Sequence, residues 1–494
     1  MTKKKKSLTK NALFYIMYNV LNIVFPLLTG IYSARILTPD SIGMVESARN
    51  LVQYFVILSF LGIPTYGLRE ISKYKNDKKE LNKIYSELMT INFISTLFFL
   101  VIYLILIFSV SKYSGNIILY LLVGMLIFLN FFNNSWLYEG LEEFQYISLR
   151  NLFFKIFAFI FLVVTVRNEN DYLFYASITI VGTAGNYILN IINSKKIVTF
   201  SLKGINLKRH LKSIFYLVFV NLAIEIYSLV DITMLGIFCD NQNVAFYSYG
   251  IKIYRILIQV LNSFTMVIVP RITLYYKSNN IDTYNSLLTK TLKVLIVLSI
   301  PLIIGIYIEA NYLIVLLYGS KYLNSAYVLK VLACSLLISP IGYLLGSRVM
   351  LSTGNEKKMI IPVASGAIIN VILNYILILQ YKEIGAAAAS LISEFVVMCV
   401  YLLFSKKYFK LNNVFNTIFH SLISSIIMAI YLYLMNSLFG ASSIFKCLII
   451  VIGAIIIYFG ILILLKEDTV NEFVVKVKNK FCIKKGDLIW KKMK

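Results

Sequence analysis

Residues 221–235 read NLAIEIYSLVDITML, an almost wholly apolar run that nevertheless contains two carboxylates, Glu225 and Asp231. The rest of the chain has a similar composition, because 59% of its 494 residues are hydrophobic and the mean hydropathy is +0.78. A soluble domain does not need so much apolar side chain, and apolar stretches of about 20 residues recur along the sequence. The composition predicts an all-α membrane protein, in which two carboxylates within a span require an explanation.

The formal net charge of +25 does not indicate nucleic-acid binding. The lysines occur in short clusters between apolar runs rather than on one soluble face. The five cysteines are scattered without a CxxC pair, and the two histidines, His210 and His420, lie far apart. We therefore expect no disulfide framework, no metal site and no cofactor.

About fourteen segments have the length and hydropathy of a membrane span, with short connections between them. They begin near Asn11, Ser41, Asn82, Asn116, Ser148, Tyr172, Leu211, Val244, Ser286, Asn324, Met359, Ile384, Phe415 and Ile444. Most of the 48 Lys and Arg residues fall in segments that share the side of the N-terminus. Because basic loops remain in the cytoplasm, both termini are predicted to be cytoplasmic.

A weak internal repeat at an offset of about 203 residues pairs the first six spans with the next six. It predicts an N-lobe over residues 1–200 and a C-lobe over 201–410. Two peripheral spans over 411–465 and a basic cytoplasmic tail over 466–494 would follow.

Four of the predicted spans carry polar side chains at helical spacing, whereas most of the others are apolar all round. A polar stripe cannot face hydrocarbon, where a central charge costs about 3 kcal/mol, so we expect these stripes to line a wet central cavity between the lobes. The cavity cations are predicted to be Arg49, Lys252 and Arg255. The polar neighbours are Asn19, Asn22, Glu46, Gln53, Gln259 and Asn262, and the carboxylates are Glu225 and Asp231.

The two carboxylates have two compatible explanations. The seventh and eighth spans are predicted to form a tight antiparallel pair that sets Asp231 near Lys252 and Glu225 near Arg255. In one explanation the acids only neutralise these cations. In the other they bind a coupling Na⁺ or H⁺ while the cations hold an anionic substrate.

The stretch WLYEGLEEFQYISLRN, residues 136–151, predicts a structural elbow between two spans. Trp136 and Tyr138 suit the membrane interface, and we expect Glu139, Glu142 or Glu143 to pair with Arg150. Lys155 and Glu394 are lesser candidates that we expect to be satisfied locally.

Several longer motifs follow one another along the chain: LTGIYSARILTPDSIGMVESARNLVQYF, LGIPTYGLREISK, WLYEGLEEFQYISLRN, VDITMLGIF, LLYGSKYLNSAYVLKVL, STGNEKK and IINVILNYILILQYKEIGAAAASLISE. Together they resemble a Wzx-type polysaccharide flippase of the multidrug/oligosaccharidyl-lipid/polysaccharide (MOP) exporter superfamily. The resemblance implies about 14 transmembrane helices, arranged as two pseudo-symmetric six-helix lobes around a central cavity plus two peripheral helices.

The resemblance also implies a function. Such a protein moves an undecaprenyl-pyrophosphate-linked oligosaccharide across the bacterial cytoplasmic membrane by alternating access, for capsule, exopolysaccharide or O-antigen synthesis. Expected partners are this glycan, membrane lipids and polysaccharide-assembly proteins such as a polymerase, with no nucleic acid. A lipid II flippase and a cation-coupled drug exporter of the same superfamily are the alternatives. An enzyme such as a membrane polymerase or ligase is disfavoured, because every predicted outer loop is short.

Overall fold

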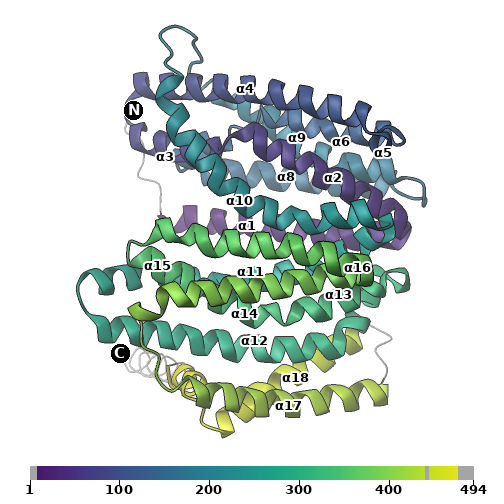
Figure 1. The fold of residues 1–494 in the computed structure, drawn as a ribbon, viewed down its shortest axis with the longest axis vertical. Helices are drawn as coiled ribbons and strands as arrows, with labels where there is room; N and C mark the ends of the chain where they lie inside the picture. The colour runs from purple at the N-terminus through teal and green to yellow at the C-terminus, as the bar shows by residue number, and fades with distance from the viewer. Residues whose placement is uncertain (1–7, 440–443, 477–494) are drawn as a thin grey trace, which may run out of the picture. The chain divides into compact units, whose positions relative to one another are not determined.

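The computed structural model describes residues 8–439 and 444–476, and of residues 8–13, 15, 16, 216–228, 439 and 444–446 it describes only the backbone. The secondary structure is helical, and none of the described residues lies in a β-strand (Figure 1). Within the described part, 11 helices are long and apolar enough to cross a membrane. The prediction of an all-α, multi-span membrane protein is confirmed. The count of about fourteen crossings and the side of the termini stay predictions.

Contacts between the helices divide the chain into two compact units. The first comprises Met1–Tyr249 with Asn374–Glu383, and the second comprises Gly250–Leu373 with Ile384–Lys494. This division does not test the lobe boundaries expected from the sequence repeat, residues 1–200 and 201–410, which stay predictions.

The first unit is built from helices that follow one another through short connections. They are α1 (Leu8–Ile36), α2 (Pro39–Phe60), α3 (Ile63–Tyr74), α4 (Lys78–Ser109), α5 (Ser111–Ser114), α6 (Ile117–Asn130), α7 (Ser135–Gly140), α8 (Phe144–Thr165), α9 (Tyr172–Ser194), α10 (Lys208–Phe238) and the first turns of α11 (Asn241–Lys277). Within this unit α8 packs between α1 and α9, while α2 packs against α4, α6 and α10.

The second unit contains the rest of α11 and the helices that follow it. They are α12 (Ile281–Tyr318), η1 (Ser320–Tyr322), α13 (Asn324–Ala333), α14 (Ser335–Ile341), η2 (Gly342–Arg348), α15 (Val349–Ser352), η3 (Glu356–Met359), α16 (Ile360–Ser405) apart from Asn374–Glu383, η4 (Lys406–Tyr408), α17 (Val414–Phe439) and α18 (Ile444–Leu464). In this unit α17 packs against both α12 and α18.

Helix α16 accounts for two of the predicted spans. Its 46 residues are broken at Lys382, where the backbone leaves the helical region at φ 49° and ψ −126°. A Cβ placed on Gly366, before the break, would lie 2.2 Å from Val397 Cγ2, after it. The two halves therefore fold back on one another as a hairpin, and a glycine occupies the point of closest approach.

Local signals in the sequence explain several helix starts. Thr38 caps α2 by accepting a hydrogen bond from the backbone N–H of Ser41, and Pro39 occupies the first turn. Asp77 caps α4 in the same way through the N–H groups of Lys79 and Glu80. These side chains satisfy helix donors that have no partner within the helix.

The predicted elbow is the short helix α7. Trp136 is 2% exposed and packs beside Tyr85, with the ring centroids 5.8 Å apart, and Tyr138 is fully buried. The aromatic rings fill the core between α3, α4 and α7, where Gly67 leaves room for the indole. Their depth relative to the membrane interface stays a prediction.

Candidate functional site

The polar residues of the first unit lie where α1 runs beside α8. Ser148 donates a hydrogen bond to the carbonyl of Phe14 at 2.6 Å, and Tyr32 donates to the carbonyl of Val166 at 3.1 Å. Contacts therefore advance in the same direction along both helices, so α1 and α8 are parallel neighbours. Residues at equal depth in the two spans meet.

Lys155 lies at the middle of this contact, as the twelfth of the 22 residues of α8. It is about 16 Å from either end of the helix at 1.5 Å per residue. Its Nζ donates to Asn22 Oδ1 at 2.6 Å and to the carbonyl of Leu21 at 3.0 Å, and it lies 5.3 Å from the centroid of the Phe25 ring. Hydrogen bonds to a charged group contribute about 1.5–3 kcal/mol each, enough to offset the roughly 3 kcal/mol cost of a mid-span charge.

A chain of amide side chains continues from Lys155 toward the start of α8. Asn151 also donates to Asn22 Oδ1, at 3.3 Å, and accepts a hydrogen bond from Asn186 at 3.4 Å. Arg150 Nε then donates to Asn186 Oδ1 at 2.8 Å. Two cations are thus joined by neutral amides drawn from α1, α8 and α9.

The expected pairing of Arg150 with a glutamate of the elbow is wrong. Arg150 is 8% exposed, stacks at 5.0 Å over the Tyr146 ring, and pairs with no carboxylate among the described residues. Glu142 instead pairs with Lys75 at 3.0 Å. The reason is geometric, because the turns of the elbow direct Glu142 toward the end of α3 and Arg150 toward α9.

Arg49 lies near the middle of α2 and has a carboxylate partner. Its Nη1 is 3.4 Å from Glu46 Oε1, and its Nη2 donates at 2.8 Å to the carbonyl of Tyr175 on α9. The guanidinium also stacks over the Tyr175 ring at 4.4 Å, and 20% of the side chain is exposed. Two predicted site residues, Arg49 and Glu46, are therefore brought together, and the glutamate is a counter-ion of the guanidinium.

The other predicted residues of α1 and α2 lie apart from this pair. Asn22 faces α8 and holds Lys155, as described above, whereas Asn19 is half-buried and Gln53 is exposed. Their predicted role as cavity-lining residues stays a prediction.

Asp231 on α10 is 4% exposed. Tyr247 donates a hydrogen bond to its Oδ2, and Asn374 Nδ2 donates to its Oδ1 at 2.6 Å. Nearby in the chain, Asn243 donates to Glu383 Oε2 at 2.6 Å. The side chain of Glu225 lies outside the described residues. The expected pairing of these two carboxylates with cations of α11 stays a prediction.

The predicted residues of the second unit follow one another along α11. Lys252 and Asn262 are half-buried, whereas Arg255 and Gln259 are exposed. Asn262 Oδ1 is buried without a hydrogen-bond partner in the described part of the chain. Their place in a shared cavity stays a prediction.

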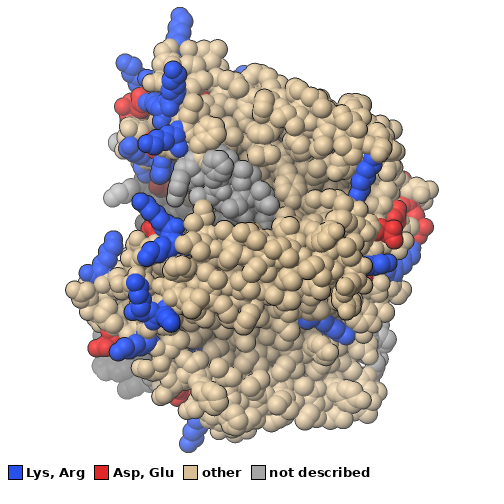
Figure 2. Space-filling view, viewed as in Figure 1, with Lys and Arg blue, Asp and Glu red and all other residues tan. Residues whose placement is uncertain are grey.

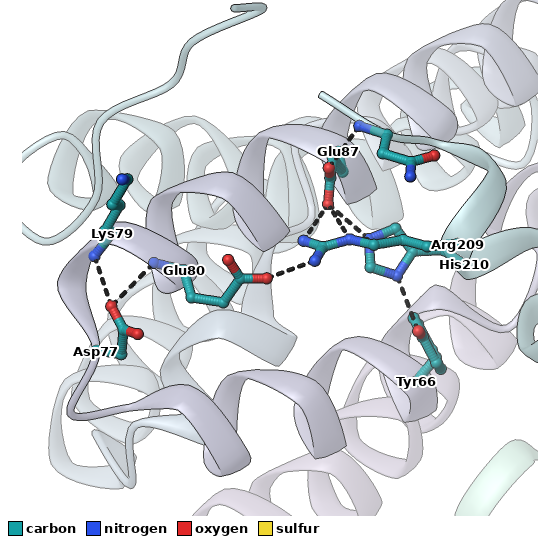
Figure 3. A network of polar contacts seen from close by, with 8 residues as sticks. Tyr66, Asp77, Lys79, Glu80, Glu87, Arg209 and His210 are labelled. Atoms are coloured by element: carbon teal, nitrogen blue, oxygen red, sulfur yellow. Dashed lines mark hydrogen bonds and ion pairs between the residues drawn. The ribbon is translucent and has the colours of Figure 1, made fainter. Parts of the chain in front are cut away.

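The sequence did not reveal a buried ionic network that ties α4 to the start of α10 (Figure 3). Glu87 is fully buried and accepts hydrogen bonds from Arg209, from His210 Nε2 at 2.8 Å and from the Asn206 backbone N–H at 2.6 Å. Tyr66 is bonded to the other ring nitrogen of His210 at 2.8 Å. More than 100 residues separate Glu87 from its partners, so no sequence spacing connects them.

The distribution of charge on the surface is that of a membrane-spanning protein. Figure 2 shows the lysines and arginines of this face gathered mostly at the ends of the helices, with few along their sides. The cations within the spans are therefore exceptions that require a role. Among the described residues no group of three or more His, Cys, Asp or Glu side chains could hold a metal ion. The cations and amides described here can bind anions and hydroxyl groups.

Comparisons with known proteins agree with this description. The chain matches the family model "Polysaccharide biosynthesis protein" over residues 8–275 and the MatE model over residues 217–376. A protein of Escherichia coli (strain K12) named for O-antigen transport is 24% identical over 419 residues, which cover 82% of this chain and 98% of that protein. A flippase of Haloferax volcanii named for low-salt glycan biosynthesis is 24% identical over 48% of this chain and 50% of its own length.

Solved structures share the fold. A lipid II flippase, MurJ in an inward closed conformation, superposes with a TM-score of 0.73 at 18% identity, covering 92% of this chain and 99% of its own. An inward-facing multidrug resistance MATE transporter superposes with a TM-score of 0.65 at 14% identity, covering 78% and 93%.

The fold and these matches show that the protein is a multi-pass membrane transporter of the MOP superfamily and not an enzyme. Within that superfamily it is a Wzx-type flippase, and the chain belongs to the polysaccharide biosynthesis protein family. The resemblance noted from the motifs is confirmed.

Proposed function

We propose that the protein moves an oligosaccharide repeat unit, joined through pyrophosphate to undecaprenol, from the inner to the outer leaflet of the bacterial cytoplasmic membrane. The product would supply capsule, exopolysaccharide or O-antigen synthesis, with a polymerase and other assembly proteins acting on it afterwards. The observation that carries the proposal is the match to the O-antigen transport protein over 98% of that protein's length.

The physical chemistry of such a cargo fits the residues within the spans. A sugar-pyrophosphate head cannot cross hydrocarbon unaided, whereas its polyprenyl tail can stay in lipid. The protein must therefore offer cations and hydrogen-bonding amides within the membrane. Arg49, Lys155 and Arg150 of the first unit and Lys252 of the second supply cations, and Asn22, Asn151 and Asn186 supply amides.

Alternating access between two states is the proposed mechanism, with Asp231 and Glu225 as candidate sites for a coupling Na⁺ or H⁺. Asp231 is buried among hydrogen-bond donors, so a change in its protonation or ligation would alter the contacts between α10, α11 and Asn374. Such a change is the kind of differential contact that couples two conformations.

Deletion of the gene tests the proposal. The expected result is loss of one surface polysaccharide and accumulation of its lipid-linked repeat unit on the cytoplasmic leaflet, with rescue by the wild-type gene. Lys252→Glu should insert and fold but fail to rescue, because it reverses a cation proposed to hold the headgroup.

Two other outcomes would contradict the proposal. Accumulation of lipid II would assign the protein to peptidoglycan synthesis, and unchanged lipid-linked saccharides with increased sensitivity to cationic drugs would assign it to drug export.

A further inference from the structure

Lys155 and Arg150 differ from Arg49 in one respect, which is the absence of a counter-ion. Arg49 lies 3.4 Å from Glu46, whereas all the recorded partners of Lys155 and Arg150 in the described part of the chain are neutral. Charges within a span almost always face the bundle interior, pair with one another or with backbone carbonyls, and mark the path of a substrate or ion. Among the described residues, the first unit thus holds two cations that no carboxylate neutralises.

The surroundings of these cations are polar and built from three helices. Lys155 is fixed by two hydrogen bonds to α1, and the amides of Asn22, Asn151 and Asn186 connect it to Arg150. Arg150 is itself more than nine-tenths buried, and its Nη1 has no hydrogen-bond partner among the described residues. A buried guanidinium donor without an acceptor is costly, and an anionic oxygen would satisfy it.

The position of the pair also suits a translocated anion. Lys155 is at the middle of α8, and Arg150 lies five residues before it, about 7.5 Å along the axis and about 140° around it, with the Asn151 amide between the two. A pyrophosphate that joins a lipid to a sugar carries two negative charges, equal and opposite to the two cations. Arginine offers forked donors to phosphate oxygens, and lysine offers a compact charge.

We propose that Lys155 and Arg150 of α8 form the anion site of the first unit, where they bind the pyrophosphate of the lipid-linked cargo. Asn22 is a positioning residue that directs the Lys155 ammonium through its Oδ1. The inference rests on the proposed function, which it deepens by assigning the anionic part of the cargo to α8 rather than to the Arg49–Glu46 pair.

Binding to the purified full-length protein in phosphatidylcholine nanodiscs tests the site. The probes are farnesyl pyrophosphate, the uncharged alcohol farnesol and inorganic pyrophosphate. Lys155→Met is expected to weaken farnesyl pyrophosphate binding at least tenfold, because it removes the charge and keeps most of the side-chain volume. Lys155→Arg is expected to stay within about threefold of the wild type. Farnesol binding should be the same for all three proteins.

Asn22→Asp separates this role from a structural one. The substitution keeps the size of the side chain and gives Lys155 a carboxylate, so the protein should remain folded while the site keeps one net positive charge instead of two, as it does in Lys155→Met. We expect it to weaken farnesyl pyrophosphate binding as much as Lys155→Met does. Lys112→Met is the matched control, because Lys112 also donates to a helix carbonyl, that of Gly236, but lies outside the spans. Its binding should not change.

Wild-type affinity for farnesyl pyrophosphate in both Lys155→Met and Asn22→Asp would overturn the site while leaving the proposed function intact. A wild-type protein that binds farnesol as tightly as farnesyl pyrophosphate would instead contradict recognition of an anionic cargo, and with it the proposed function. Inorganic pyrophosphate should bind at least tenfold more weakly than farnesyl pyrophosphate. Equal affinity would overturn the assignment to a lipid-linked ligand in favour of the free anion.

Discussion

Substitution of Glu87 by Gln should release the start of α10 from α4. In the wild type, Glu87 Oε2 accepts hydrogen bonds from Arg209 and His210, while Oε1 accepts one from the Asn206 N–H. A glutamine has one acceptor oxygen, so its amide N–H₂ must face either the Asn206 donor or the cationic pair. When the amide faces the cationic pair, the remaining acceptors of Arg209 are Glu80, which is partly exposed, and His210.

The expected size of the effect follows from burial. Removing one partner of a buried ion pair costs about 3–5 kcal/mol, and in this network Glu87 and His210 are buried while the Arg209 side chain is 30% exposed. At 1.4 kcal/mol per tenfold change, this raises the local opening constant roughly a hundredfold to a few thousandfold. Amide hydrogen exchange followed by mass spectrometry should show the loss of protection over residues 206–212, which lie at the network.

Glu142→Gln is the matched control for this experiment. The Lys75–Glu142 pair is close to half exposed, with side-chain exposures of 43% and 50%, and exposed pairs contribute less than about 1 kcal/mol. Exchange near Glu142 should therefore rise less than about fivefold. Unchanged protection over residues 206–212 in Glu87→Gln, or an equally large effect in the control, would refute the assigned role of burial.

Three further predictions concern coupling, packing and pH. If the Asp231 carboxylate binds a coupling cation, Asp231→Asn should slow export and make the export rate less dependent on pH or Na⁺. An unchanged export rate with unchanged ion dependence would show that Asp231 is only a structural hydrogen-bond acceptor. Gly67→Ala should destabilise the protein by about 1–3 kcal/mol in thermal unfolding, because the new Cβ would lie 2.7 Å from the buried indole ring of Trp136. Gly305→Ala is the control and should not destabilise it, because no atom would lie nearer than 4.0 Å to the new Cβ. Equal stability of the two variants would contradict the tight contact at Gly67. The hydrogen bond from Lys290 outweighs partial burial and lowers the pKa of Glu472 below its ordinary value near 4.3. The Lys290–Glu472 contact, which links α12 to residues 468–476, should therefore persist at neutral pH and be lost as the pH falls through the lowered pKa. An acid-stable protease should cleave residues 468–476 faster at acidic pH, and cleavage no faster than at pH 7 would contradict this link.

The positions of the long helices could be predicted because hydropathy depends only on local sequence. Helical structure occupies all fourteen predicted segments, and the stop between two of them at Lys382 has the backbone conformation of a turn. The polar positions could also be found, since Asn22, Arg49 and Asp231 are conspicuous within apolar runs.

The partners of these polar residues could not be predicted, because they depend on which helices are neighbours. Arg49 stacks on Tyr175, which is 126 residues away, and Lys155 meets Asn22 only because α1 and α8 run in parallel. The elbow glutamates were preferred as partners of Arg150 for their nearness in sequence, and the turn directs at least Glu142 elsewhere. Equal depth in two spans of the same direction is a signal that could have paired Asn22 with Lys155.

The most direct test is transport by the purified protein in liposomes. An undecaprenyl-pyrophosphate-linked oligosaccharide with a fluorescent sugar is placed in both leaflets, and a membrane-impermeant reductant bleaches the outer label. Wild-type protein should expose the inner label to bleaching within the assay, while Lys155→Met should expose it at least tenfold more slowly. Bleaching that stops at the outer leaflet with the wild-type protein, as in protein-free liposomes, would contradict the account.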